Sequence, residues 1–139
     1  MERDFDATRD YPLGAHRPDL VSTPGGLALH DITLDALREG AIEPADIRAT
    51  SETLLLQAEV ARVAGRAPLA ESLERAAELA TVPDELLLAV YTALRPGRAT
   101  RAQLDEWAAR LEGHGAQTTA RLVREAADAY AERGLLADD

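Results

Sequence analysis

The sequence contains no cysteine among its 139 residues, and aromatic residues make up only 4% of it. The absence of cysteine excludes thiolate nucleophiles, disulfides and thiolate ligands for zinc or iron–sulfur clusters, and it fits a reducing compartment. With so few aromatic rings, the core must be built from small and aliphatic side chains. This composition favours closely packed helices over wide ligand pockets.

Long apolar runs and excess positive charge are also missing. No run approaches the roughly 20 apolar residues of a membrane span, and the first six residues lack the basic-then-apolar order of a secretory signal. Lys and Arg total 15 against 25 Asp and Glu, so the formal net charge is -10. An acidic chain repels phosphate backbones and anionic lipids. We therefore expect a cytoplasmic protein that binds neither nucleic acid nor membrane.

Residues 1–32 differ in composition from the rest of the chain. Proline and glycine recur there often enough to interrupt any helical or strand pattern, which predicts an irregular, extended arm. The arm nevertheless carries apolar residues without an amphipathic period, among them Leu13 and Leu20. Because long irregular segments are uncommon inside a compact domain, these side chains need another surface, and we favour a partner chain over the protein's own helices.

Residues 33–139 show helical periodicity throughout, which predicts an all-α domain, a small multi-helix bundle joined to the extended arm. Capping residues such as Thr33, Thr50 and Thr100, together with glycine and proline stops, set the expected ends of the helices. The predicted segments are two short ones at 33–40 and 44–47, followed by helices at 50–64, 68–80, 83–94, 100–111 and 117–133. In the helix at 50–64, the spacing puts Leu56, Val60, Val63 and Ala64 on one apolar face.

The joint at residues 94–100 has the features of a stop, a turn and a restart. Pro96 lacks the N–H that a continuing helix needs, and Thr100 with Gln103 forms a capping-box pattern. Helical spacing predicts one apolar stripe on each side, comprising Leu87, Val90, Tyr91 and Leu94 before the joint and Leu104, Trp107, Ala108 and Leu111 after it. Arg95 and Arg98 flank the turn. They can pair with a partner's carboxylates or bind the last carbonyls of the preceding helix, the second being favoured for Arg95.

No motif in the sequence carries recognisable chemistry. His16, His30 and His114 are far apart and outside any metal-ligand spacing, so we expect them to be solvent-exposed. The sequence has neither a phosphate-binding loop nor a nucleophile elbow, and adjacent carboxylates are explained by first-turn helix preferences. We therefore predict no catalytic, cofactor-binding or metal-binding residue.

Short segments distributed over nearly the whole chain after residue 10 carry a family resemblance. They are Tyr11-Pro12-Leu13-Gly14, Arg17-Pro18, Thr23-Pro24, Asp31-Ile32-Thr33, Glu52-Thr53-Leu54, Leu56-Gln57-Ala58, Ala64-Gly65-Arg66, Arg75-Ala76-Ala77-Glu78-Leu79, Pro83-Asp84, Ala93-Leu94-Arg95-Pro96 and Arg124-Glu125-Ala126-Ala127. In this order and spacing they resemble the small (gamma) subunit of adenosylcobalamin-dependent diol and glycerol dehydratases.

The resemblance implies a non-catalytic subunit of a hydro-lyase that converts propanediol or glycerol to the aldehyde and water by radical chemistry. It implies that the other subunits bind adenosylcobalamin and that this chain binds the large subunit directly. The complex also contains the medium subunit and is expected to be a dimer of heterotrimers. It leaves open whether the enzyme lies inside a bacterial microcompartment. The residues we predict at the partner interface are Tyr11, Leu13, Arg17, Leu20, Arg95 and Arg98.

A different class of function stays open from the pattern alone. The paired helices at 50–80 and 83–111 are also typical of a free-standing helical adaptor without an enzymatic role. The absence of a clean internal repeat of about 34 residues counts against that alternative.

Overall fold

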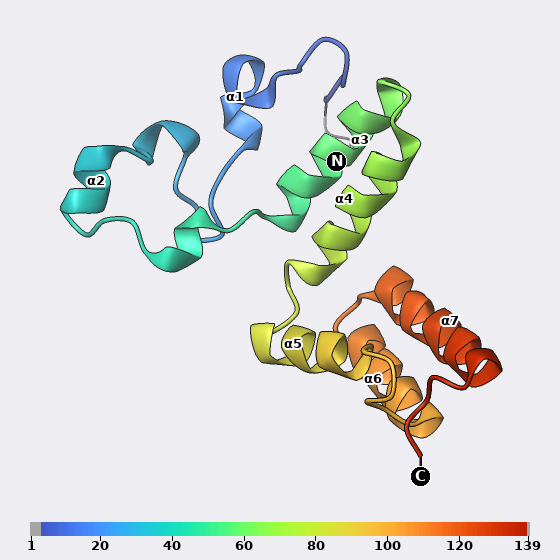
Figure 1. Ribbon diagram of the computed structural model, residues 1–139. Coiled ribbons are helices and arrows are strands. Elements are labelled where there is room, and N and C mark those ends of the chain that lie inside the picture. The colour runs from blue at the N-terminus through green and yellow to red at the C-terminus, as the bar shows by residue number, and fades with distance from the viewer. Residues whose placement is uncertain (1–3, 139) are drawn as a thin grey trace. The chain divides into compact units, whose positions relative to one another are not determined.

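The computed structural model describes residues 4–138, and the chain packs as two compact units (Figure 1). The first unit ends at Ala77 and the second begins at Glu78. The boundary predicted between residues 32 and 33 therefore falls inside the first unit. Residues 1–3 of the predicted arm and residue 139 of the predicted helical domain lie outside the described range.

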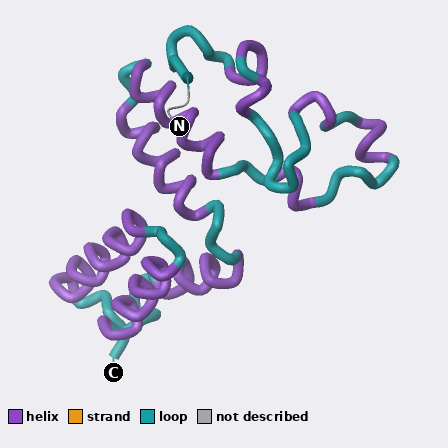
Figure 2. Tube along the Cα trace, turned by 180° about the vertical axis from the view of Figure 1, so that it is seen from behind, coloured by secondary structure: helices purple, strands orange, loops and turns teal. Residues whose placement is uncertain are grey.

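Helices account for all the regular structure in the described residues, so the predicted all-α class is confirmed (Figure 2). An isolated bridge between Ser22 and Ala28 is the one β-type pairing there. The α-helices are α1 (Leu13–His16), α2 (Leu34–Arg38), α3 (Ser51–Val63), α4 (Ala67–Leu79), α5 (Asp84–Ala93), α6 (Arg101–Gly113) and α7 (Gln117–Arg133). Three 3-10 helices accompany them, η1 (Pro18–Leu20), η2 (Leu29–Asp31) and η3 (Pro44–Ile47).

The predicted arm is less irregular than its composition suggests. It contains α1, η1 and η2, and the Tyr11–Pro12 peptide bond is cis. Pro12 and Pro18 sit where helices tolerate proline, directly before α1 and at the first position of η1, and all three helices of the arm are only three or four residues long. Ala7 and Leu13 are buried, so the arm packs part of its apolar surface within its own unit.

Helices α3 and α4, the two longest helices that begin in the first unit, lie side by side in both views (Figures 1 and 2). The hydroxyl of Thr50 accepts a hydrogen bond from the Thr53 amide at 3.2 Å, as its predicted capping role requires. The contact between the helices is made by small side chains, Ala58, Ala61 and Ala70.

The apolar face predicted for the helix at 50–64 is wrong in its last turn. Val63 was placed on the buried stripe, but its side chain is 61% exposed. The buried stripe of α3 instead follows Leu56 and the alanines that contact α4. The side of α3 that packs in the interior of the first unit is therefore its alanine face, although alanine is less apolar than valine.

The second unit has the larger core, at the contact between α6 and α7. Six side chains there have no exposed surface, namely Leu104, Ala108, Leu111, Ala120, Val123 and Ala127. The predicted stripe of α6 is therefore confirmed. Trp107 packs against this core while partly exposed, with the Arg110 guanidinium 4.7 Å from the centre of its ring.

The joint between α5 and α6 adopts the predicted stop, turn and restart. Gly97 has φ +73°, a left-handed conformation that favours glycine, and Thr100 and Gln103 form both hydrogen bonds of the capping box. The chain after α7 returns to this joint, where the Gly97 amide donates to the Leu135 carbonyl at 2.8 Å. The end of the chain thus closes the second unit.

The apolar stripe predicted for α5 is wrong at Tyr91, whose side chain is 58% exposed. The buried positions are Leu86, Val90 and Ala93, while Leu87 and Leu94 are partly buried and pack against the core. The observed stripe shares Val90 with the predicted one and is centred on the side of Leu86 and Ala93, away from Tyr91. Spacing alone fits both stripes, and the choice depends on which residues meet the tightly packed α6.

Candidate protein-binding surface

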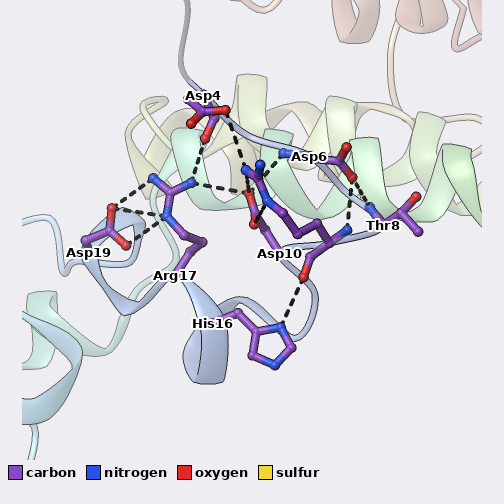
Figure 3. A network of polar contacts seen from close by, with 8 residues as sticks. Asp4, Asp6, Thr8, Asp10, His16, Arg17 and Asp19 are labelled. Atoms are coloured by element: carbon purple, nitrogen blue, oxygen red, sulfur yellow. Dashed lines mark hydrogen bonds and ion pairs between the residues drawn. The ribbon is translucent and has the colours of Figure 1, made fainter.

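The start of the first unit is held by a network of ion pairs centred on Asp10 (Figure 3). The Asp10 side chain is buried, and it accepts from Arg9 Nε at 2.6 Å, from Arg17 Nη1 at 3.2 Å and from the Asp6 amide at 3.0 Å. The hydrogen bond from Arg9 is the largest of several influences that hold the pKa of Asp10 far below its ordinary value. Asp10 is therefore an anion at any physiological pH, and both of its carboxylate oxygens accept hydrogen bonds.

Arg17 links this network to the next turn of the chain. Its guanidinium donates to the Asp4 carbonyl at 2.6 Å and to Asp19 at 3.0 Å, in addition to Asp10. The hydrogen bond with Asp19 is the main reason that the pKa of Arg17 is raised. Arg17 was predicted at a partner interface. Its guanidinium instead donates to three acceptors within the arm, those of Asp4, Asp10 and Asp19, so Arg17 stabilises the shape of the arm.

The other interface residues predicted in the arm differ in exposure. Tyr11 is 59% exposed, Leu20 is partly buried, and Leu13 is only 6% exposed. Tyr11 borders a recess of about 520 Å³ that α3 and α4 line with aliphatic side chains such as Val60 and Leu69. Tyr11 is therefore available to a partner, whereas Leu13 is enclosed within its own unit.

The two predicted interface residues outside the arm, Arg95 and Arg98, belong to the second unit. Both are exposed, and among residues 4–138 their guanidinium groups form no hydrogen bond or ion pair. The cap predicted for Arg95 on the preceding helix is thus absent. An uncommitted guanidinium on a tight turn can pair with a partner's carboxylates, and this role stays a prediction.

A long loop, which we call the clasp loop, spans residues 23–46 and is closed at its base by its two ends. Thr23 is buried and donates its hydroxyl hydrogen to Asp46 Oδ1 at 2.8 Å, and the Leu27 amide donates to the same hydroxyl at 3.0 Å. The other oxygen of Asp46 accepts from the Glu43 amide at 3.0 Å. This last bond, followed by the Thr23 hydroxyl, lowers the pKa of Asp46.

Gly25 completes the closure, because a Cβ atom at this position would lie 2.6 Å from Asp46 Oδ1. A side chain there would push the carboxylate away from Thr23. We refer to Thr23, Gly25 and Asp46 together as the clasp. It joins residues 23 positions apart, so sequence spacing contained no sign of it.

The clasp loop leaves large apolar side chains in solvent. Leu34 is 70% exposed, Leu37 is 55% exposed and Ile32 is 40% exposed, while Ile47, directly after the loop, is 77% exposed. Both views show the part around α2 extending away from the α3–α4 pair (Figures 1 and 2). Exposed apolar groups gathered on one segment mark an interaction site. The residues predicted at the partner interface include none of these four, although the sequence predicted short helical segments at 33–40 and 44–47.

The described residues contain no arrangement suited to a metal ion. Across residues 4–138, no three His, Cys, Asp or Glu side chains gather closely enough to bind one. His16, His30 and His114 are exposed, as predicted. The recess beside Tyr11 contains no histidine among its lining residues and so offers no nitrogen donor to a corrinoid cobalt. None of the helices in the described part of the chain is both long and apolar enough to cross a bilayer.

The chain thus has exposed apolar surfaces that suit binding, and its described residues form no metal site. The family model described as dehydratase small subunit matches residues 7–137. The chain belongs to the dehydratase small subunit family. The resemblance drawn from the sequence is thereby confirmed.

Curated members of this dehydratase family are similar along most of their length. The propanediol dehydratase small subunit of Citrobacter freundii is 46% identical over 131 residues, which cover 94% of this chain and 76% of that protein. The propanediol dehydratase small subunit of Salmonella typhimurium is 45% identical over 131 residues, with the same coverage of both chains. The matched part includes the clasp loop and both compact units.

Proposed function

We propose that this chain is the non-catalytic small subunit of a coenzyme-cobalamin-dependent propanediol or glycerol dehydratase and that it stabilises the enzyme by binding the large subunit. The observation that carries the proposal is similarity, over 94% of the chain, to proteins named propanediol dehydratase small subunit. The exposed apolar side chains of the first unit support it, because a subunit needs such a surface and a free monomer is penalised for it.

The proposal places the reaction on other chains. Adenosylcobalamin bound by the other subunits supplies the radical chemistry, and the large subunit holds the diol. This chain contributes rigid helices and an ordered arm that contact the large subunit, in a complex that also contains the medium subunit. We propose a dimer of such heterotrimers in the cytoplasm.

Coexpression tests the proposal. The chain is produced with the large and medium subunits of the same organism, with an affinity tag on the large subunit alone. We expect the chain to co-purify and the complex to convert 1,2-propanediol to propionaldehyde when adenosylcobalamin is added. The proposal fails if the other two subunits are soluble and fully active without this chain and never retain it. If the chain is a compact monomer that binds neither subunit, the result would instead support the alternative function, a free-standing helical adaptor.

A further inference from the structure

We propose that the clasp loop is the docking element of this chain and that its occupant is a basic, apolar-centred surface on the large subunit of the same enzyme. The inference rests on the proposed function, since it names the part of the chain that binds the partner. It differs from the interface predicted in the arm at Tyr11, Leu13 and Leu20.

The clasp loop has no core of its own to account for its apolar residues. The described residues from 24 to 55 include none that is buried. Its one α-helix, α2, has five residues, and isolated helices of that length are unstable in water. A segment of this length without a core is either disordered or held by something else. The clasp holds the two ends of the loop together. The residues between them therefore stay exposed to solvent, where a partner can reach them.

The exposed apolar residues are arranged to enter a partner together. Leu34 and Leu37 lie three positions apart on α2 and so share one helix face. Near the base, Leu29, Ile32 and Ile47 line a recess of about 350 Å³. A partner that covers α2 and fills this recess would remove all five side chains from water.

Charge defines the partner further. Residues 23–46 contain five acidic side chains and one basic one, and Asp35, Glu39 and Glu43 are exposed. A complementary surface therefore places Lys and Arg around its apolar centre. The same charge disfavours two other occupants. A second copy would bring two acidic loops face to face, and an anionic membrane would repel the loop.

The clasp lowers the cost of binding by fixing the loop beforehand. Thr23, Gly25 and Asp46 close the base without any contribution from a partner, so less conformational freedom is lost on docking. Thr23 is therefore a positioning residue, which acts on the partner through the shape of the loop.

The decisive experiment measures binding of the full-length chain to the purified large subunit from the same organism, by surface-immobilised kinetics. The variant L34S/L37S removes the two apolar anchors, and the matched control is Leu88→Ser, a leucine 68% exposed on α5 of the second unit. We expect the double variant to weaken binding about 30-fold. The control is expected to stay within about twofold of the unmodified chain, and all three are expected to keep the same helical circular-dichroism signal.

Two further variants separate charge and shape. Reversing charge in D35K/E39K is expected to slow association about tenfold at low salt, with the difference fading as salt rises. Thr23→Val keeps the shape of the side chain but removes the hydroxyl bond to Asp46, and we expect it to slow association without changing the salt dependence.

Each outcome decides one proposal. If the unmodified chain binds and L34S/L37S binds equally well, the docking inference is overturned and the proposed function stands. If the unmodified chain binds neither the large subunit nor the assembled enzyme, both are overturned. A self-association of the unmodified chain that L34S/L37S abolishes would assign the loop to a second copy and also overturn the inference.

Discussion

Replacing Glu78 should show that one carboxylate stabilises the start of α7 from outside that helix. The residue preceding α7, Ala116, has no side chain able to cap it, and the first turn contains no acid. The Glu78 carboxylate takes both roles. Its Oε2 accepts from the Thr118 amide at 3.0 Å and from the Thr119 amide at 3.2 Å, and the Thr119 hydroxyl donates to it at 3.4 Å.

The expected magnitude follows from these contacts. A side-chain cap contributes about 1 kcal/mol, and a carboxylate at a helix N-terminus contributes about 0.5 kcal/mol more. Glu78→Gln keeps one acceptor oxygen but loses the charge, so the free energy of unfolding of the second unit should fall by about 1 kcal/mol. For a unit of this size the urea dependence is about 1 kcal/mol per molar, which converts to a midpoint lower by about 1 M.

The assay is urea unfolding followed by tryptophan fluorescence. The chain has a single tryptophan, Trp107, which packs against the core of the second unit, so the signal reports on the unit that contains Glu78. The matched control is Glu125→Gln, an exposed position on α7 itself. A surface substitution of this kind should change the free energy of unfolding by less than about 0.5 kcal/mol.

The dependence on pH gives a second, independent test. Partial burial alone would raise the pKa of Glu78, but hydrogen bonds from Thr118 and Thr119 outweigh it, and the pKa lies below the ordinary value of 4.5. A lowered folded-state pKa means that the stabilisation is complete above about pH 4.5 and is lost as the pH falls through the folded-state value. The gap between the unmodified chain and Glu78→Gln should therefore be full at pH 7 and should shrink below pH 4.5. Equal stabilities at pH 7, or a gap unchanged down to pH 3, would refute the reasoning.

Three other perturbations test the packing of each unit. In urea unfolding, Leu104→Ala should lower the free energy of unfolding of the second unit by about 3 kcal/mol, because this side chain has no exposed surface. The control Leu122→Ala, on the exposed side of α7, should lower it by less than about 1 kcal/mol. Gly97→Ala should cost about 1 kcal/mol in the same assay, since its φ of +73° is unfavourable for alanine, and an unchanged midpoint would contradict that strain. Asp10→Asn should speed hydrogen exchange of the arm amides by removing the charged acceptor of Arg9 and Arg17, while exchange in α6 stays constant.

The helix ends and the turn between α5 and α6 could be predicted from the sequence, because they depend on local interactions. Thr50 and Thr100 cap the helices that they were predicted to cap, and Gly97 turns the joint, because a cap or a left-handed turn depends on residues only a few positions apart. The family was also visible in the sequence. Many of its marks are prolines, glycines and capping residues, whose order and spacing can be read directly from the chain.

The face that each helix buries could not be read in the same way. Tyr91 and Val63 fit apolar stripes by spacing, yet both are exposed. Periodicity limits a helix to a few possible faces, and the choice depends on which face lets the neighbouring backbone approach. In this protein many of the buried positions are alanines. A hydropathy pattern ranks alanine below leucine and valine, so it does not identify these faces as the buried ones.

The exposed apolar surface that we propose for binding depends on tertiary structure. The sequence pointed to a partner and to apolar residues in the arm, but the clasp brings Thr23 to Asp46 across the loop, and Glu78 reaches an amide 40 residues away. Such contacts depend on where the whole backbone runs, which no local pattern encodes. By itself the sequence determined the helices, their ends and the family. Only the folded chain decided that Leu34 and Leu37 are presented to solvent while Leu13 is enclosed, because exposure is set by what surrounds a residue and not by its type.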